Sequence, residues 1–344
     1  SQHLELSRLA RRLRGPPGGR GFGGTVTRDE KMAIGTLARA FEAKGEGTCL
    51  VLDGGLGTEL ERRGHDIYHP LWSARLLVEQ PDAIAEANRA FAEAGADLLA
   101  TATYQATFPG LEKLDFDREE AAEFFRKSVR LTRRVADQFV PPKTVLLSIG
   151  SFGAYLADGS EYTGDYGISD AQLADFHRDR LALLAELAGP RDLIAFETLP
   201  NGREARILVE LLEAFPDAEA CFSFSCRNDR ELQDGTPLAD CVRFLNGRSQ
   251  VAAIGVNCIE PAIARELVRR VAGETDRPVM VYPNSGKGWD AATSSWCGDE
   301  SDAESFAQQA IEWRRAGARI IGGCCRTTPR HIRRVRETLE SLGL

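Results

Sequence analysis

The sequence lacks a long hydrophobic run and an excess of positive charge. No apolar stretch approaches the roughly 20 residues that a helix needs to span a bilayer, so we expect neither a membrane-spanning segment nor a membrane partner. The chain has 43 Lys and Arg against 51 Asp and Glu, a formal net charge of −8. Nucleic-acid-binding surfaces normally carry a basic patch, so the charge balance argues against a nucleic-acid partner.

The chain also begins without the apolar segment of a secretory signal. Its eight cysteines therefore indicate reduced thiols in a reducing compartment, and we expect a cytoplasmic protein. Cys324 and Cys325 are adjacent, and neighbouring cysteines seldom bond to each other. Metal binding is therefore a hypothesis to test.

Residues 1–35 differ in composition from the rest of the chain. Five arginines lie around the Gly/Pro cluster at 15–19, and Glu5 is the only acid before Asp29. We expect a disordered Arg/Gly-rich tail. An organelle transit peptide has a similar composition, and a tail foreign to the native protein, with Met32 as the true start, is a third interpretation.

Eight β-rich runs alternate with helical patterns from residue 49 onward. The runs cover residues 49–53, 97–104, 144–149, 193–197, 220–226, 251–258, 278–282 and 319–322. The helical stretches between them include 81–94, 118–139, 170–187, 203–215, 261–272, 303–316 and 329–342. This alternation indicates βαβ units on a parallel sheet. We therefore predict an α/β fold, a single-domain (β/α)8 TIM barrel over residues 36–344, rather than an open doubly wound sheet.

The carboxyl ends of barrel strands are where catalytic residues gather. The predicted strand ends are Asp53, Tyr104, Gly150, Glu197, Cys226, Cys258, Asn284 and the pair Cys324-Cys325. Only one strand separates Cys258 from that pair, so three thiols meet at one rim. Three soft thiolates suit Zn²⁺ and leave a fourth position open, as in a catalytic site. Gly322 and Gly323 are expected to supply the bend that lets both neighbouring thiols face one ion.

Buried free cysteines are often inert, and this is our expectation for Cys49, Cys221 and Cys241. Cys226 and Cys297 remain open, because either could line the barrel mouth. A fourth protein ligand from one of these two thiols would make the zinc site closed and structural.

Several motifs at these strand ends resemble the homocysteine S-methyltransferases. They are Asp53-Gly-Gly-Leu-Gly-Thr58, Thr103-Tyr-Gln-Ala106, Phe196-Glu-Thr198, Gly255-Val-Asn-Cys258, Tyr282-Pro-Asn-Ser-Gly286 and Gly322-Gly-Cys-Cys-Arg-Thr-Thr-Pro329. The resemblance covers about residues 48–340, and the Gly-Gly-Cys-Cys motif is its most specific part. The segments at Tyr104-Gln105 and at 283–286 are most similar to the branch that uses S-methylmethionine.

The resemblance implies a barrel in which Cys258, Cys324 and Cys325 hold zinc. It also implies that Asp53, the Gly54 backbone and Glu197 hold the amino-acid end of homocysteine. A salt bridge inside the barrel is the alternative role for Glu197.

The expected reaction needs no catalytic side chain beyond the zinc-bound thiolate of the substrate. Zinc with an open position deprotonates a thiol at neutral pH, and the homocysteine thiolate attacks an activated methyl group to give methionine. A sulfonium such as S-methylmethionine or S-adenosylmethionine is the expected donor. We expect Tyr104, Asn284 and Trp289 on the donor side, since aromatic faces attract cations; Tyr104 has a core role as its alternative.

Other functions remain open from the sequence. Betaine or a methylated corrinoid could be the donor, and a zinc-stabilised barrel could bind a ligand without turnover, since barrels host many functions. None of His65, His69, His177 and His331 ends a strand, so we expect these histidines on the surface or in loops.

Overall fold

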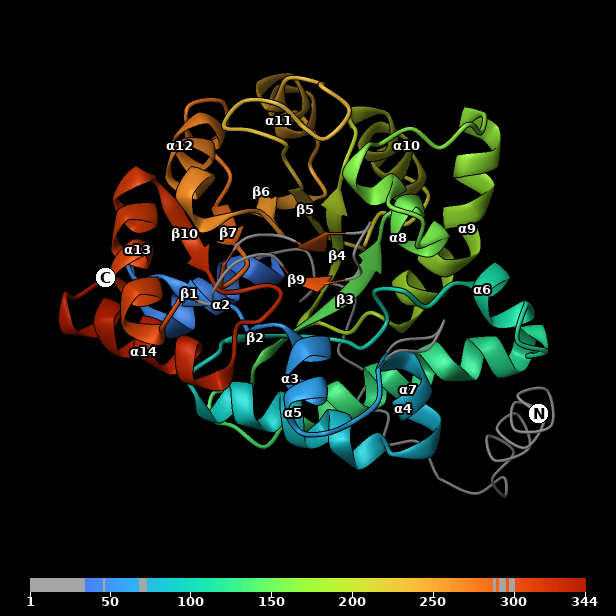
Figure 1. Ribbon diagram of the computed structural model, residues 1–344, viewed down its shortest axis with the longest axis horizontal. Helices are drawn as coiled ribbons and strands as arrows, with labels where there is room; N and C mark the ends of the chain where they lie inside the picture. The colour runs from blue at the N-terminus through green and yellow to red at the C-terminus, as the bar shows by residue number, and fades with distance from the viewer. Residues whose placement is uncertain (1–34, 46, 68–72, 287–288, 291–294, 297–300) are drawn as a thin grey trace.

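Eight parallel strands stand at the centre of the molecule, and helices surround them (Figure 1). The computed structural model describes residues 35–45, 47–67, 73–286, 289–290, 295–296 and 301–344. The barrel strands are β1 (Leu50–Val51), β2 (Leu98–Ala100), β3 (Thr144–Gly150), β4 (Asp192–Leu199), β5 (Ala220–Phe224), β6 (Val251–Asn257), β7 (Val279–Tyr282) and β10 (Ala318–Ile321). Their order is β1-β10-β7-β6-β5-β4-β3-β2, and a bridge between Leu52 and Leu98 joins β1 to β2. The predicted (β/α)8 barrel is confirmed.

The outer helices follow the strands in the expected alternation. They are α2 (Thr36–Lys44), α3 (Leu56–Arg62), α4 (Ser73–Glu79), α5 (Pro81–Glu93), α6 (Phe108–Glu112), α7 (Arg118–Ala136), α8 (Phe152–Leu156), α9 (Asp170–Leu187), α10 (Gly202–Leu212), α11 (Leu238–Asn246), α12 (Pro261–Ala272), α13 (Ala303–Ala316) and α14 (Pro329–Ser341). A 3₁₀ helix, η1 (Ser160–Tyr162), and a short antiparallel pair, β8 (Trp289–Asp290) with β9 (Ser295–Trp296), lie in connections. Helices α9, α12 and α13 have the predicted bounds. The predicted tail lies outside the described residues, except for Gly35.

Local sequence signals account for several helix ends. Asp117 and Ser169 begin α7 and α9 with capping boxes, in which the side chain and the third helical residue satisfy each other's free backbone groups. Gly95 and Gly317, with φ of 102° and 122°, follow α5 and α13. A residue with a side chain is strained in that region, which is why glycine stands at both positions.

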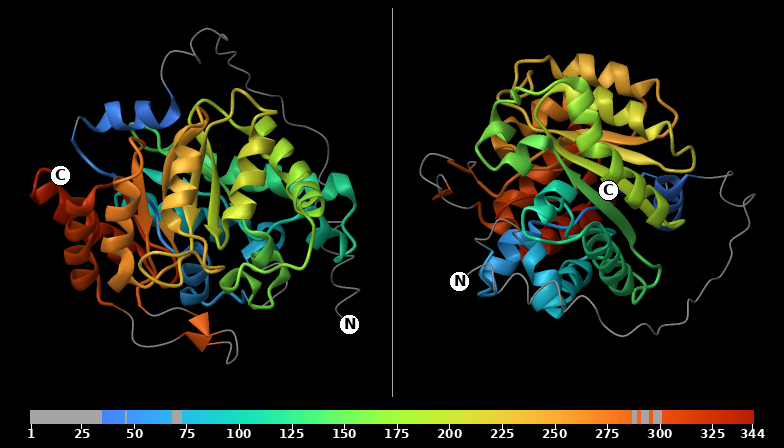
Figure 2. Two further views of the ribbon diagram at one scale, coloured as in Figure 1. Left: turned by 90° about the horizontal axis from the view of Figure 1, so that it is seen from above. Right: turned by 90° about the vertical axis from the view of Figure 1, so that its right-hand side faces the viewer.

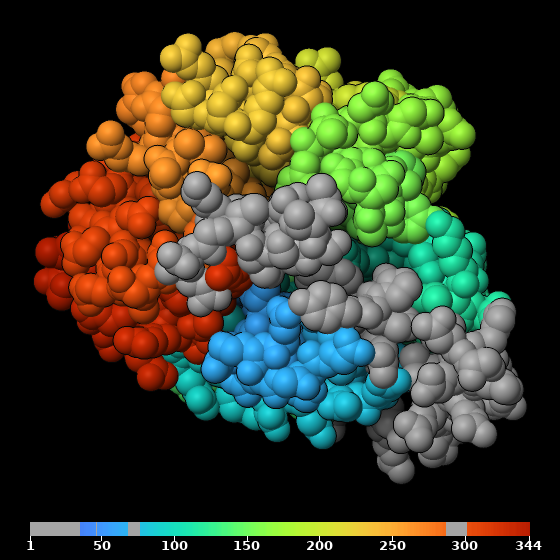
Figure 3. Space-filling view, viewed as in Figure 1, coloured from blue at the N-terminus to red at the C-terminus, as the bar shows by residue number. Residues whose placement is uncertain are grey.

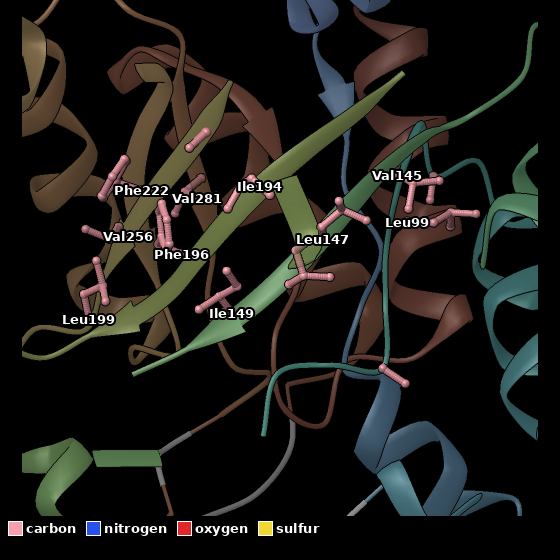
Figure 4. Close-up of a cluster of buried hydrophobic side chains, with 14 of the residues drawn as sticks. Leu99, Val145, Leu147, Ile149, Ile194, Phe196, Leu199, Phe222, Val256 and Val281 are labelled. Carbon is pink, nitrogen blue, oxygen red and sulfur yellow. The ribbon is translucent and has the colours of Figure 1, made fainter. Parts of the chain in front are cut away.

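Alternation along the strands separates two hydrophobic layers. Ile194 and Phe196 of β4 point outward into the layer beneath the helices, together with residues such as Leu147 of β3 (Figure 4). Leu193 and Ala195 point inward and fill the barrel. Because successive strand residues face opposite sides, Glu197 continues the inward series. The strand pattern thus directs a carboxylate into the barrel.

The two ends of the barrel are closed differently. Helix α2 packs Leu37, Ala40 and Phe41 against the inner core at the amino end of the strands, and the β8–β9 pair lies at the opposite end (Figure 2). The loops of that carboxyl end carry the predicted site. In the described part of the chain, no helix is long and apolar enough to cross a membrane.

Few backbone hydrogen bonds join β1 to β2, and aspartate side chains supply further hydrogen bonds across this joint. The Val51 N–H donates to Asp97 Oδ2 at 2.9 Å, and the Ala100 N–H donates to Asp53 Oδ2 at 2.8 Å. Two backbone bonds, Asp97 N to Val51 O and Asp53 N to Leu98 O, lie between them. One aspartate thus closes each end of the joint.

Candidate metal and substrate site

Three predicted cysteines come together at the carboxyl end of the barrel. The sulfur atoms of Cys258, Cys324 and Cys325 all lie within 4.8 Å of one another. Cys325 Sγ is 3.9 Å from Cys258 Sγ and 3.9 Å from Cys324 Sγ. All three residues are half-buried. The cluster is therefore compact enough for one ion and is accessible from the mouth.

Cys258 reaches this cluster through a strained strand end. Its φ is 52°, and Thr198 at the end of β4 has a φ of 57°, both unusual for residues other than glycine. The buried Asn257 amide lies between them: Oδ1 accepts the Thr198 N–H at 2.9 Å, and Nδ2 donates to Thr198 Oγ1 at 2.8 Å. Strain of this kind persists where surrounding contacts fix it and is common at functional sites.

Close packing, rather than a special backbone angle, requires the two glycines before Cys324. A Cβ on Gly322 would lie 2.6 Å from Leu52 Cβ, and one on Gly323 would lie 2.3 Å from Thr327 Oγ1. The left-handed residue is Arg326, with φ of 63°. The chain leaves the sheet after Ile321, so both neighbouring thiols can face one point. The prediction that glycine supplies the bend is therefore wrong in its mechanism.

A cavity of about 210 Å³ opens beside the three thiols. Asp53, Gly54, Tyr104 and Glu197 line it, as do the three cysteines. Asp53 and Glu197 are 3% and 8% exposed. Burial raises the pKa of Asp53 to about 8 and that of Glu197 to about 7.

Glu197 is bound only by neutral groups in the described part of the chain. The Ser148 hydroxyl donates to its Oε2, and the Tyr282 hydroxyl donates to Oε1 at 3.1 Å. None of the ion pairs among the described residues includes Asp53 or Glu197. The alternative of an internal salt bridge thus has no support, and both carboxylates are free to face a positively charged ligand.

A model of the family described as Homocysteine S-methyltransferase matches residues 50–339, most of the barrel. The chain belongs to the homocysteine S-methyltransferase family.

Relatives in this family match the chain over nearly their whole length. Homocysteine S-methyltransferase YbgG of Bacillus subtilis is 40% identical over 302 residues, which are 85% of this chain and 95% of the relative. Homocysteine S-methyltransferase of Escherichia coli is 44% identical over 289 residues, 82% of this chain and 93% of the relative. The crystal structure of the E. coli homocysteine methyltransferase MmuM in its metallated form has a TM-score of 0.76 and 41% identity, and covers 85% of this chain and 96% of that one. Together with the cysteine cluster, this comparison supports a metal site.

The other described cysteines lie outside the cavity. Cys226 is 6% exposed, belongs to the outer core and does not line the cavity. Cys49, Cys221 and Cys241 are buried, as expected. Cys297 lies outside the described residues. Within the described part of the chain, the cluster that could hold a metal ion therefore consists of three thiols.

Asn284 lies behind the cysteine cluster rather than in the cavity wall. It is 2% exposed, and its Oδ1 accepts the Cys325 N–H at 3.2 Å. Its own N–H donates to the Ile259 carbonyl. This geometry suits a residue that orients Cys325. The side chain of Trp289 lies outside the described residues.

Gly54 lines the cavity and tolerates no side chain. A Cβ there would lie 2.6 Å from the Phe91 ring and 2.8 Å from the Thr327 carbonyl. The adjacent Gly55 N–H donates to that carbonyl. The first and last βα units therefore touch at the mouth, where Figure 3 shows the blue and red segments next to each other.

Sequence reasoning missed several residues of the cavity wall. Ser148, Thr198, Asn257 and Tyr282 are strand residues that line it. Ser148 and Tyr282 share the inward face with the core residues Leu146 and Met280, so alternation along β3 and β7 could have identified them. Glu161 and Tyr162 of η1 also line the cavity; they come from a loop that has no strand signal.

The expectation of surface or loop positions is wrong for two histidines. His177 of α9 is fully buried: its Nδ1 accepts from Arg180 at 2.8 Å and its Nε2 donates to Glu204 Oε1 at 2.8 Å. These partners satisfy both ring nitrogens, and burial lowers the pKa of His177. His331 is 6% exposed and completes the capping box of α14. His65 lies in a loop as expected, and His69 lies outside the described residues.

Proposed function

We propose that this chain transfers a methyl group from a sulfonium donor, S-methylmethionine foremost, to the thiolate of homocysteine, with Zn²⁺ held by Cys258, Cys324 and Cys325. The products are methionine and the demethylated donor, which is also methionine when S-methylmethionine is used. The observation that carries the proposal is the placement of three clustered thiols beside a cavity with two buried carboxylates.

The donor set supports zinc as the ion. Two thiolates that bind one tetrahedral Zn²⁺ at about 2.3 Å lie about 3.8 Å apart, close to the 3.9 Å that separates Cys325 Sγ from each of its neighbours. Thiolates also prefer soft or borderline ions. When bound, zinc supplies a Lewis acid that keeps the substrate sulfur deprotonated at neutral pH.

Of the three thiols, Cys324 loses its proton most readily, because its thiolate raises the pKa of Cys258 and Cys325. The pKa of Cys324 is held well below its usual range because the Cys258 and Cys325 thiols donate hydrogen bonds to its sulfur. The Asn257 amide adds a further bond to the same sulfur. The first proton of the cluster therefore leaves Cys324, and this prepares the site for a cation.

Asp53 and Glu197 are the residues we assign to the α-ammonium group of homocysteine. A carboxylate accepts charge-assisted hydrogen bonds from an ammonium group, and the burial of both side chains makes their unpaired charge costly. An ammonium group relieves that cost for both. It would also orient the substrate with its sulfur toward the thiols.

The donor must carry a good leaving group, because a thiolate does not displace methyl from a neutral thioether. In a sulfonium, the S–CH₃ electron pair returns to the departing sulfur as the new S–CH₃ bond forms, so no acid or base needs to touch the methyl group. The protein's contribution is alignment of the two sulfurs.

Side-by-side donor assays test the proposal. Zinc-loaded protein is incubated with homocysteine and either S-methylmethionine, S-adenosylmethionine or betaine, and the products are identified by mass spectrometry with a labelled methyl group. We expect label in methionine, fastest from S-methylmethionine. A faster reaction with betaine, or homocysteine binding without turnover of any donor, would overturn the proposal.

A further inference from the structure

A second acidic wall faces the thiols from outside the barrel. Glu161 and Tyr162 belong to η1, in the connection between β3 and α9, and line the same cavity as the cysteines. Asp53 and Glu197, by contrast, come from the strand ends. The Glu161 carboxylate interacts electrostatically with Cys324 and Cys325. The cavity therefore has acids on its barrel side and on its loop side.

A glycine of α8 allows the Glu161 backbone to lie close to that helix. A Cβ on Gly153 of α8 would lie 2.5 Å from the Glu161 nitrogen and 2.7 Å from its Cα. Only a residue without a side chain allows α8 and η1 to approach this closely. Among the described residues, no ion pair includes Glu161.

Gln105 places a second acceptor in the wall of the same cavity, beside Glu161, whose carboxylate has a hydrogen bond with Tyr162. The Oε1 atom of Gln105 is buried and has no hydrogen-bond partner among the described residues. Its neighbours are fixed: the Tyr104 carbonyl accepts the Gly150 N–H at 3.0 Å, and the Ala106 carbonyl accepts from buried Arg180 at 3.3 Å. A buried acceptor left without a donor costs free energy, so this position favours a ligand that supplies one.

The chemistry of these groups distinguishes between the two positive centres of an amino-acid sulfonium. A sulfonium has no N–H or O–H group and cannot satisfy a hydrogen-bond acceptor, whereas an ammonium group has three donors. Rings of Tyr104 and Tyr162 in the same wall can instead face the sulfonium. In an in-line displacement, the donor sulfur lies on the far side of the methyl group from the attacking sulfur, and the two substrates need separate anchors.

We propose, on the basis of the proposed function, that Glu161 and the Gln105 amide bind the α-ammonium group of an amino-acid methyl donor. Asp53 and Glu197 then serve homocysteine, and the two ammonium groups are bound by different acids. The pair makes donors that carry an amino-acid end preferred over betaine, which has no N–H group.

Steady-state kinetics with both substrates varied test this assignment. Glu161→Gln should raise KM for S-methylmethionine about 10- to 100-fold, and Gln105→Leu should raise it about 10-fold. KM for homocysteine should stay within about twofold of wild type in both. Gly153→Ala, which pushes the Glu161 backbone away, should also raise the donor KM.

Asp165→Asn is the matched control. Asp165 is an exposed acid in the same connection, and its Oδ1 accepts the Gly167 N–H, a bond that an asparagine can keep. It removes the same charge and should leave both KM values unchanged. Calorimetric titration of S-methylmethionine into each protein gives a readout without turnover, and the dissociation constant should follow the donor KM.

The outcomes separate this assignment from the proposed function. If wild-type protein methylates homocysteine but Glu161→Gln binds the donor as tightly as wild type, the assignment is overturned and the proposed function stands. An equal rise in both KM values would also overturn it. If wild-type protein uses no sulfonium donor, the proposed function itself fails.

Discussion

Buried carboxylates at the two ends of the barrel have different partners. At the amino end, Asp97 pairs with Lys44 at 2.8 Å and with Arg336, and Asp192 pairs with Arg133. At the carboxyl end, Asp53 and Glu197 are bound by backbone N–H and hydroxyl groups alone within the described residues. The same residue types therefore serve the fold at one end and are left for a ligand at the other.

This difference follows from the cost of burying charge. A buried carboxylate is stable when a cation and hydrogen bonds offset its lost hydration. The amino end meets that condition within the chain. The carboxyl end has no such cation among the described residues. The pKa values of Asp53 and Glu197 are therefore raised, because burial disfavours their charged forms. The four tests below ask whether the two ends can be disturbed independently.

The largest effect is expected at the thiols. Cys324→Ser should lose stoichiometric zinc and lower kcat by about 10³-fold or more, since metal activation contributes several kcal/mol to catalysis. The melting temperature of the metal-free protein should hardly change. Cys226→Ala, which removes a thiol outside the cavity, is the control and should keep both zinc and activity. Full zinc content in Cys324→Ser, measured by atomic emission, would refute the site.

Asp97→Asn should affect stability alone. Arg336 is only 10% exposed, and loss of the Asp97 charge leaves it with Glu340 at 3.7 Å and the Gly95 carbonyl as partners, at a cost of about 3 kcal/mol. Urea unfolding should show this loss. The kcat/KM of the folded protein should match wild type, and a parallel fall in kcat/KM would mean that the two ends are coupled.

Glu197→Gln should lower activity without lowering stability. Removal of the charge weakens the bond to the homocysteine ammonium group, and kcat/KM for homocysteine should fall about 10- to 100-fold. The free energy of unfolding should not decrease, because a neutral amide is less costly to bury than a carboxylate. Unchanged kinetics in this variant would exclude Glu197 from the substrate contacts.

The carboxyl end should also give stability a pH dependence. A carboxyl group whose pKa is raised from 4.5 to about 7 in the folded state, as for Glu197, keeps its proton in the folded protein after the unfolded chain has released it. Stability therefore falls as pH rises through this window, and Asp53 extends it to about 8. Urea midpoints of the metal-free protein should fall from pH 5 to pH 8. The fall should be shallower in Glu197→Gln, and an equal slope would contradict the assigned cause.

Sequence patterns predicted the fold and the clustering of the three cysteines well, because both depend on periodicity and strand ends. The eight strands and the meeting of Cys258 with Cys324 and Cys325 followed from local signals. The E. coli and B. subtilis relatives confirm the family that the motifs indicated.

The remaining features depend on contacts between distant segments. Glu161 reaches the cavity through a turn that packs on Gly153, and no strand or helix pattern marks it. The partner of His177 is 27 residues away in sequence on α10, and Asn284 bonds to Cys325 across 41 residues. Such partners become visible only when the chain is folded.

The joint between β1 and β2 links substrate binding to local opening of the barrel. The Ala100 amide is held by the same Asp53 carboxylate that we assign to the substrate. Protection of a backbone amide from solvent exchange depends on how often its bond opens. A ligand seated on Asp53 holds that carboxylate in place, so release of substrate and local opening of the first strand pair become linked motions. The exchange rate of the Ala100 amide would then report how much of the protein has substrate bound.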